Sequence, residues 1–252
     1  MMAVQIFIPL LLSFLAGVST VIGSLIAFFI KRFKSSYLAF LLGFSSGVMI
    51  FISFVEFLGT SIKNIGFLQA NIGFFVGVAI IYLLDTLIPH VYKEEEGDNK
   101  KSYELKRIGT LIALGIAIHN FPEGIAVLFS SLSDIRLGIA VALAIALHNI
   151  PEGICVSAPI YYATKSKRKA FLYSFLSGIA EPIGALFAVL LLYPFINQFV
   201  LSLMFAVVAG IMVYISFDEL LPLCFKYKKH HLSILGLFLG MVVMAVSLYF
   251  LG

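Results

Sequence analysis

The sequence predicts an all-α membrane protein with eight transmembrane helices, in which an inverted repeat relates helices 1–3 to helices 6–8 around a central pair, helices 4 and 5. Three observations predict this fold. Of the 252 residues, 61% are hydrophobic and 12% are charged, and the mean hydropathy is +1.07, which is far from the composition of soluble domains. Long apolar runs recur along the whole chain. Two of these runs resemble each other, although they would cross the membrane in opposite directions.

The apolar runs are continuous rather than alternating, which favours helices over a β-barrel. Each run is long enough to cross a hydrocarbon core of about 30 Å. We therefore expect one transmembrane domain over residues 1–252, with a single long connection at 91–107. The runs cover residues 4–30, 37–59, 65–90, 108–130, 137–162, 170–192, 197–221 and 232–251.

The distribution of basic residues predicts the orientation. If the N-terminus lies outside, all of the 17 Lys and Arg residues except Lys63 and Arg136 fall on the inner side. An excess of Lys and Arg is typical of cytoplasmic connections. We therefore expect a multi-pass protein of the cell membrane with both termini outside and the connection at 91–107 in the cytoplasm. Because these connections account for the net charge of +4, we expect the lipid bilayer, and no nucleic acid, as a partner.

The inverted repeat is visible in two segments. Residues 47–58 of the second run align without gaps on residues 210–221 of the seventh, with Gly, Met, Ser and Glu matching in register. The first segment would run from inside to outside and the second from outside to inside. Repeats of this kind are typical of transporters, whose binding sites commonly lie at the repeat interface near the bilayer midplane.

Two hexapeptides, residues 119–124 and 148–153, lie inside the fourth and fifth runs. They read His-Asn-Phe-Pro-Glu-Gly and His-Asn-Ile-Pro-Glu-Gly, and so differ only at the third position. Within each copy the His, Asn and Glu are three or four residues apart, so that the side chains share one face of a helix. Because His and Glu are costly inside a membrane, both hexapeptides are candidate functional sites.

The depth of the hexapeptides favours a transport site. His119 lies 12 residues past Arg107, and His148 lies 12 residues past Arg136. At 1.5 Å per residue, each histidine is ~18 Å from its own side of the membrane. The two motifs therefore meet near the midplane on antiparallel helices. Glu181, in the sixth run, adds a third carboxylate at mid-membrane.

This set of side chains predicts a metal site. Carboxylates gathered in a region of low dielectric repel one another, and a divalent cation would resolve that conflict. Imidazole together with carboxylate suits zinc, ferrous iron, cobalt or manganese better than magnesium or calcium. The only cysteines, Cys155 and Cys224, form no metal-binding motif. The candidate ligands are His119, Asn120, Glu123, His148, Asn149, Glu152 and Glu181.

At these residues the sequence resembles the ZIP (Zrt/Irt-like) metal transporter family. The resemblance rests on the helix count, the outward termini, the cytoplasmic connection and both hexapeptides, and it covers essentially the whole chain. It implies uptake of a divalent cation, zinc first, with iron, manganese or cobalt as further substrates, and neither enzymatic activity nor a cofactor. It also implies two adjacent metal sites bridged by two glutamates. The first would use His119, Glu123, His148 and Glu152, with Met49 as a soft ligand, and the second Asn120, Glu123, Asn149, Glu152 and Glu181.

In one respect the sequence departs from part of the family. Some relatives carry Asp or Gln where the second hexapeptide has His148 and Asn149. The second site of this chain would therefore be less acidic, and its preference among metals cannot be taken from those relatives.

Two other classes of function remain as alternatives. An intramembrane di-metal enzyme is disfavoured because a zincin-type protease requires His-Glu-x-x-His, and residues 120 and 149 are Asn. Di-iron bundles use Glu-x-x-His, which has the opposite order. The second alternative is a proton or sodium carrier that binds no metal. Metal-dependent uptake into vesicles separates all three classes. The sequence leaves the oligomeric state open, a homodimer included.

Overall fold

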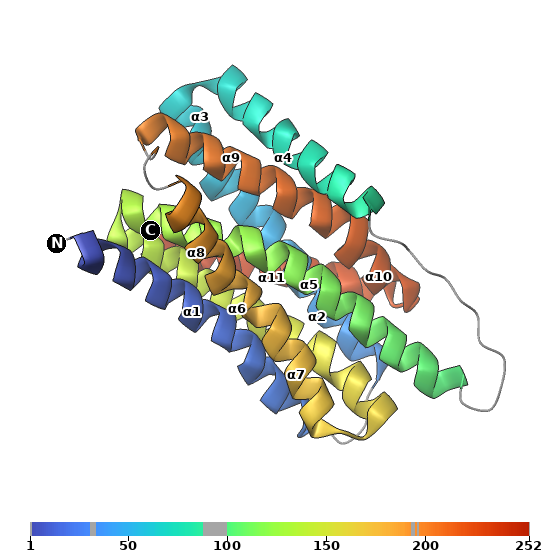
Figure 1. Cartoon of the computed structure of the whole chain (residues 1–252). Helices are drawn as coiled ribbons and strands as arrows, with labels where there is room; N and C mark the ends of the chain where they lie inside the picture. Colours follow the sequence, from blue (N-terminus) through green and yellow to red (C-terminus); the bar gives the residue numbers. More distant parts are fainter. Residues whose placement is uncertain (1, 31–33, 88–99, 193–194, 196, 252) are drawn as a thin grey trace.

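The computed structural model describes the chain except for residues 1, 31–33, 88–99, 193–194, 196 and 252. Eight described helical segments are long and apolar enough to cross a membrane, which confirms the predicted number. Among the described residues all regular structure is helical. The helices lie roughly side by side, and both termini are at the same end of the bundle (Figure 1).

The second and seventh crossings each consist of three consecutive helical pieces, and the sixth consists of two. The helices are α1 (Met2–Ala27), α2 (Ser35–Ile52), η1 (Ser53–Leu58), α3 (Gly59–Ile65), α4 (Phe67–Leu87), α5 (Lys100–Ser133), α6 (Ile135–Thr164), α7 (Lys167–Gly178), α8 (Ala180–Leu192), α9 (Gln198–Ile215), η3 (Ser216–Leu220), α10 (Leu221–Lys226) and α11 (His230–Leu251).

The fourth crossing begins earlier than the sequence predicts. Residues 100–107, expected in the long connection at 91–107, form the first turns of α5. Hydropathy marks where a helix enters the hydrocarbon core, but a helix continues into water as long as its polar residues favour helical structure. The prediction for this part of the connection is therefore wrong. Its other residues, 91–99, lie outside the described part of the chain.

The sixth crossing bends where α7 ends and α8 begins. Pro182 has no backbone N–H, so the carbonyl oxygen of Gly178, four residues earlier, has no helical donor. The helix resumes at once, because the N–H of Ile183 donates to the carbonyl oxygen of Ile179 at 3.2 Å. The bend therefore leaves the carbonyl oxygen of Gly178 available for a contact outside its own helix.

The two segments of the inverted repeat share an unusual local structure. Each contains a π-helical turn, η1 in the second crossing and η3 in the seventh, and both turns begin at equivalent serines. Ser53 donates to the carbonyl oxygen of Met49 at 2.6 Å, and Ser216 donates to that of Met212 at 2.8 Å. The likeness of the two segments therefore extends to backbone hydrogen bonding.

Close contacts at glycine repeat in the same way. A Cβ atom at Gly47 of α2 would overlap the carbonyl oxygen of Leu237 of α11. At the equivalent position, a Cβ atom at Gly210 of α9 would overlap the carbonyl oxygen of Phe74 of α4. The pairs α2–α11 and α9–α4 are therefore two copies of one packing arrangement. Two more pairs of contacts are equivalent in the same way. The contact of Gly77 with Val207 corresponds to that of Gly240 with Phe44, and the contact of Gly73 with Leu203 corresponds to that of Gly236 with Phe40.

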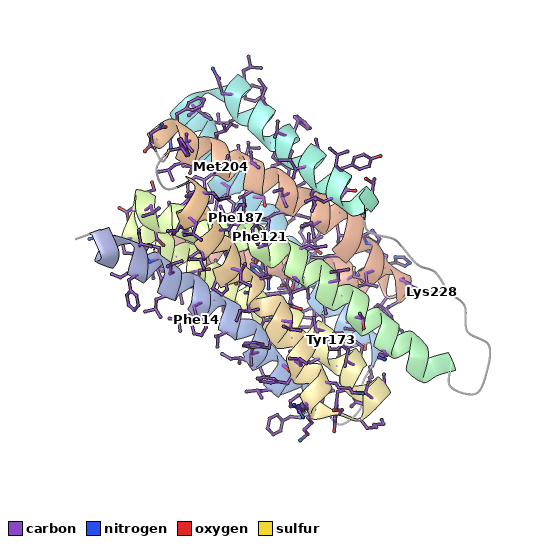
Figure 2. All side chains as sticks on the ribbon, viewed as in Figure 1. Phe14, Phe121, Tyr173, Phe187, Met204 and Lys228 are labelled. Carbon is purple, nitrogen blue, oxygen red and sulfur yellow. The ribbon has the colours of Figure 1, made fainter. Side chains whose placement is uncertain are left out.

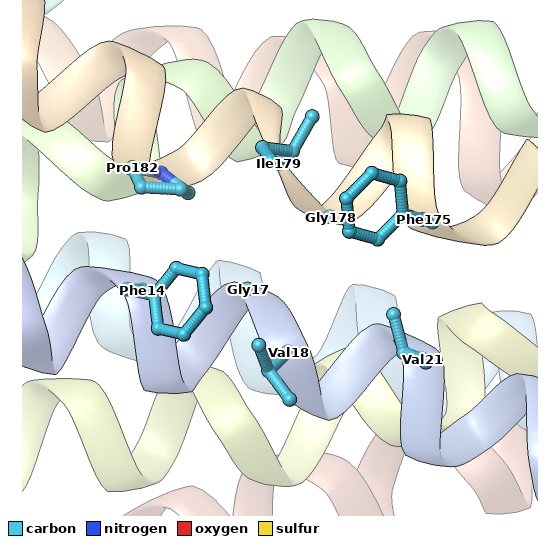
Figure 3. Close-up of a pocket in the computed structure, with 8 residues that line it drawn as sticks. All are labelled: Phe14, Gly17, Val18, Val21, Phe175, Gly178, Ile179 and Pro182. Carbon is cyan, nitrogen blue, oxygen red and sulfur yellow. The ribbon is translucent and has the colours of Figure 1, made fainter. Parts of the chain in front are cut away.

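The first and sixth crossings form a second equivalent pair. At the point where α1 meets α7 and α8, a Cβ atom at Gly17 would overlap the carbonyl oxygen of Gly178, and one at Gly178 would overlap that of Gly17. This reciprocal contact marks the pseudo-twofold axis of the repeat. It lies beside a small apolar pocket whose lining consists of four equivalent pairs (Figure 3). They are Phe14 and Phe175, Gly17 and Gly178, Val18 and Ile179, and Val21 and Pro182.

Candidate metal centre

The two hexapeptides lie on the central helices, α5 and α6, which pass through Pro122 and Pro151 without a break. Glycine fixes how closely these helices approach their neighbours. A Cβ atom at Gly124 would overlap the carbonyl oxygen of Glu181 on α8, and one at Gly153 would overlap that of Thr20 on α1. Each hexapeptide is thus held against the backbone of one member of the α1/α8 pair.

The third residue of the hexapeptides, the only one at which they differ, points away from the polar residues. The ring of Phe121 packs against Phe187 of α8, with 5.4 Å between the ring centroids (Figure 2). The carbonyl oxygen of Phe121 is the atom that a Cβ at Gly184 would overlap, and that of Ile150 has the same relation to Gly23. The variable position therefore serves helix packing, and its backbone makes the same contact in both copies.

The first contact between the polar faces of α5 and α6 joins Glu123 to His148. Oε1 of Glu123 lies 3.0 Å from Nε2 of His148, and both side chains are fully buried. A protonated ring nitrogen donates a hydrogen bond here, whereas a deprotonated one could bind a metal ion. The two predicted ligands are therefore within reach of one cation, which would take the place of the shared proton.

The two asparagines are held by equivalent hydrogen bonds. The amide nitrogen of Asn120 donates to the carbonyl oxygen of Ser177, and that of Asn149 donates to the carbonyl oxygen of Ala16, each at 3.0 Å. The amide nitrogen of Asn149 also donates to Oε2 of Glu181 at 2.9 Å. Because a carbonyl oxygen can only accept, the donor atom of each amide is fixed, and its oxygen points elsewhere.

Four buried oxygen atoms at this centre have no hydrogen-bond partner among the described residues. They are Oδ1 of Asn120, Oε2 of Glu123, Oδ1 of Asn149 and Oε1 of Glu181. An unsatisfied buried polar atom is costly, and such atoms are few in folded proteins. Four of them in one region, two of which belong to carboxylates, form a set of acceptors that suits a cation.

The other predicted ligands lie on the same helices or next to them. Glu152 is fully buried on α6. Met49 is fully buried on α2, one turn after Ser45, whose hydroxyl donates to the carbonyl oxygen of His148 at 3.5 Å. The backbone of His119 is helical, but its side chain lies outside the described part of the structure. Among the side chains that are described, no three of His, Cys, Asp and Glu are already arranged around a common point as metal ligands.

Comparison with known proteins decides the family. The profile of the family described as "ZIP Zinc transporter" matches residues 88–248. The chain belongs to the ZIP family. Three relatives named "Zinc transporter ZupT" match nearly full length, which confirms the ZIP and ZupT-like character predicted from the hexapeptides. The protein of Streptococcus mutans is 48% identical to this chain, and the alignment covers 98% of each protein. The protein of Campylobacter jejuni is 49% identical with the same coverage, and the protein of Nitratidesulfovibrio vulgaris is 50% identical with 94% of each protein covered.

Membership of the ZIP family makes the chain a transporter rather than an enzyme, as predicted. Sequence reasoning missed the carbonyl acceptors of the two asparagines, Ala16 and Ser177. A signal for them is present, because residues 13–24 and 174–185 share Ser, Phe, Leu, Gly, Ile and Gly in register. Small and apolar residues dominate both segments, so the match does not stand out until the helices are seen to pack together.

Proposed function

We propose that this ZIP protein carries divalent metal ions, zinc first, across the cell membrane into the cytoplasm through a centre for two ions at the bilayer midplane. The proposal is carried by four fully buried oxygens beside His148 that have no hydrogen-bond partner within the described part of the chain, those of Asn120, Glu123, Asn149 and Glu181. Iron, manganese and cobalt are further substrates that a mixed imidazole and carboxylate centre accepts. The transported ion is the substrate, and the proposed mechanism includes no cofactor.

The proposed ligands divide into two sets. One ion is bound by His119, Glu123, His148 and Glu152, with Met49 beside them, and the second ion by Asn120, Glu123, Asn149, Glu152 and Glu181. Glu123 and Glu152 belong to both sets and bridge the two ions. Because the amide nitrogens of both asparagines are held by backbone carbonyls, their oxygens are directed toward the second ion without further rearrangement.

Metal binding at this centre is coupled to proton release. The 3.0 Å contact between Glu123 and His148 holds a proton in the metal-free protein. A cation that binds both groups must displace this proton, because a ring nitrogen cannot bind a proton and a metal at the same lone pair. The ion therefore replaces a hydrogen bond, and the buried carboxylate is never left without a positively charged or hydrogen-bonding neighbour.

The proposed direction of transport follows from the charges at the ends of the bundle. The junction of α6 and α7, which contains Lys165 and Lys167, lies at the end of the bundle opposite the termini (Figure 1). Lys228, between α10 and α11, lies toward the same end (Figure 2). By the positive-inside rule this is the cytoplasmic end, and both termini lie outside. Because the ligands come from α2, α5, α6 and α8, we propose that residues 1–252 act as a single domain.

Zinc uptake into vesicles tests the proposal. Purified protein is reconstituted with a zinc-sensitive dye inside, and uptake is compared for wild type, Glu123→Ala and Glu152→Ala at equal protein content. We expect both variants to fall to the rate of empty vesicles. As a matched control, Asp134→Asn removes a carboxylate at the start of α6 but keeps a residue that caps a helix, and it should transport normally.

Near-normal uptake by either glutamate variant would overturn the proposed centre. Uptake of protons or sodium without any metal, sensitive to the same variants, would instead favour a carrier of those ions. The mass of the protein in lipid nanodiscs tests the homodimer in the same preparation.

A further inference from the structure

The pseudo-twofold axis assigns a partner position to every residue of the centre. Four independent contacts define the correspondence between α1 and the α7/α8 crossing: the reciprocal contact of Gly17 and Gly178, the backbone contacts of the two hexapeptide glycines, the contacts of Gly23 and Gly184, and the bonds of the two asparagines. All four agree on one register. In that register Glu181 of α8 corresponds to Thr20 of α1, and Asn149 corresponds to Asn120.

The backbones of Thr20 and Glu181 make equivalent close contacts with neighbouring helices. Its carbonyl oxygen accepts a hydrogen bond from Ser174 at 2.9 Å and is the atom that a Cβ at Gly153 would overlap. The corresponding carbonyl, that of Glu181, lies under Gly124. Both residues therefore project their side chains from equivalent, rigid positions on either side of the axis.

The side chain of Thr20 is fully buried, and its hydroxyl has no hydrogen-bond partner among the residues that the structure describes. Helix interiors normally offer a Thr hydroxyl the carbonyl oxygen three or four residues earlier. Thr20 does not use it, and a buried hydroxyl without a partner is costly. A helical threonine retained only for packing would be expected to make this internal bond.

The same side of the centre contains a second unsatisfied atom. Thr20 Cβ and Oγ1 lie against Gly178, next to Ser177, whose carbonyl oxygen accepts from Asn120. On the other side, Asn149 donates its second N–H to the carboxylate of Glu181. The threonine side chain is two carbon atoms shorter than glutamate, and no equivalent contact from the amide nitrogen of Asn120 to Thr20 is present among the described residues. Oγ1 of Thr20 has no hydrogen-bond partner there, and the amide oxygens of Asn120 and Asn149 lack one on both sides of the axis.

We propose that Thr20 is a further binding residue for the transported cation, acting through water where Glu181 acts directly. The hydroxyl hydrogen-bonds a water molecule of the hydrated ion that Asn120 and Glu123 hold, since one bridging water makes up the missing length. This rests on the proposed function. Because a neutral hydroxyl faces a carboxylate across the axis, the centre has one negative charge fewer than a symmetric one. The pair Thr20 and Glu181 is thus a place where selectivity among divalent ions is set.

The test compares variants that separate the hydroxyl from the shape of the side chain. Thr20→Val is isosteric but has no hydroxyl, Thr20→Ala also lacks it, and Thr20→Ser retains it. Zinc affinity of the purified protein is measured by competition with a chromogenic chelator, and the KM for uptake is measured in vesicles. We expect roughly a fivefold rise in both constants for Thr20→Val and Thr20→Ala, which corresponds to one neutral hydrogen bond of about 1 kcal/mol. Thr20→Ser should stay within about twofold of wild type.

Two further variants complete the test. Ser24→Ala removes another buried hydroxyl, one turn further along α1, that has no hydrogen-bond partner among the described residues, and the zinc affinity of this variant should be unchanged. Wild-type affinity in Thr20→Val, equal losses in Thr20→Val and Thr20→Ser, or an equal loss in Ser24→Ala would each overturn the inference. Glu123→Ala is measured in parallel: if it binds no zinc while Thr20→Val binds normally, only the role of Thr20 fails, whereas normal binding by Glu123→Ala refutes the proposed function itself.

Discussion

Replacing the two asparagines one at a time measures the asymmetry of the centre. Asn120 and Asn149 are both fully buried, occupy equivalent positions and donate to equivalent carbonyl oxygens at 3.0 Å. Among the described contacts they differ in the 2.9 Å hydrogen bond from Asn149 to Glu181. Asn120→Ala and Asn149→Ala therefore create cavities of the same size and remove the same backbone bond. The difference between their stabilities isolates the bond to the carboxylate.

The expected difference follows from typical hydrogen-bond energies. Hydrogen bonds between neutral groups inside membrane proteins contribute about 0.6 kcal/mol on average, so the bond lost in Asn120→Ala should account for about 1 kcal/mol or less. Asn149→Ala also removes the hydrogen bond to the buried side chain of Glu181, and a buried acceptor that loses its donor costs about 1–3 kcal/mol. For a chain of this size 1 kcal/mol corresponds to about 2–4 °C in Tm. Asn149→Ala should therefore melt at least about 2 °C below Asn120→Ala.

Both purified variants are unfolded by heating in detergent with a zinc chelator present. Because the chain has no Trp, unfolding is monitored by the exposure of cysteine thiols rather than by tryptophan fluorescence. A double-mutant cycle with Glu181→Ala then gives the coupling energy of the pair. Equal melting temperatures, or a coupling energy near zero, would refute the reasoning, since the bond to Glu181 would then contribute nothing in the metal-free protein.

Three other predictions concern the choice of ion, the orientation in the membrane and the packing of α6 against α1. His148→Asp exchanges a borderline nitrogen ligand for a hard oxygen, so competition of manganese against labelled zinc should strengthen, and an unchanged ratio with a lower rate would show that this residue does not select the ion. Glu56→Cys should react with an impermeant thiol reagent from outside only and Glu219→Cys from the cytoplasmic side only; reversed sidedness would overturn the orientation. Gly153→Ala should lower both melting temperature and uptake, because a methyl group there meets the backbone of α1, and a fully active, stable variant would contradict that contact.

Several parts of the fold were predictable because they depend on one-dimensional properties. Hydropathy is a sum over consecutive residues, so the number of crossings was predicted correctly. The start of α5 at Lys100 was not predicted, because hydropathy does not detect polar helical turns beyond the hydrocarbon core. The spacing within the hexapeptides placed their polar residues on one helical face. That placement brings Glu123 within 3.0 Å of His148. The metal ligands as a set stay a prediction.

Other features depend on which helices meet. The bonds from the asparagines to Ala16 and Ser177 involve backbone acceptors, whose side chains do not mark them as hydrogen-bond partners. Thr20 lies among small residues of α1 and is expected from sequence to serve packing. Its position opposite Glu181 becomes visible only when Gly17 and Gly178 define the axis between them. The match of residues 13–24 with 174–185 already aligns Thr20 with Glu181, but small and apolar residues dominate both segments, so the match stands out only after the two helices are seen to pack together.

The mirrored π-helical turns have a consequence for which side chains reach the interior. A π turn accommodates one residue more than an α turn, so everything that follows is rotated by about 100° relative to an uninterrupted helix. In the second crossing the buried positions accordingly pass from Ser53 to Phe57 and Ser61, while Glu56 and Thr60 stay half-buried and hydrogen-bond to each other at 3.2 Å. The extra residue in η1 thus rotates the helix so that the carboxylate of Glu56 lies beside the core rather than within it. The described part of the chain contains a second such turn, η3, in the seventh crossing, which runs in the opposite direction.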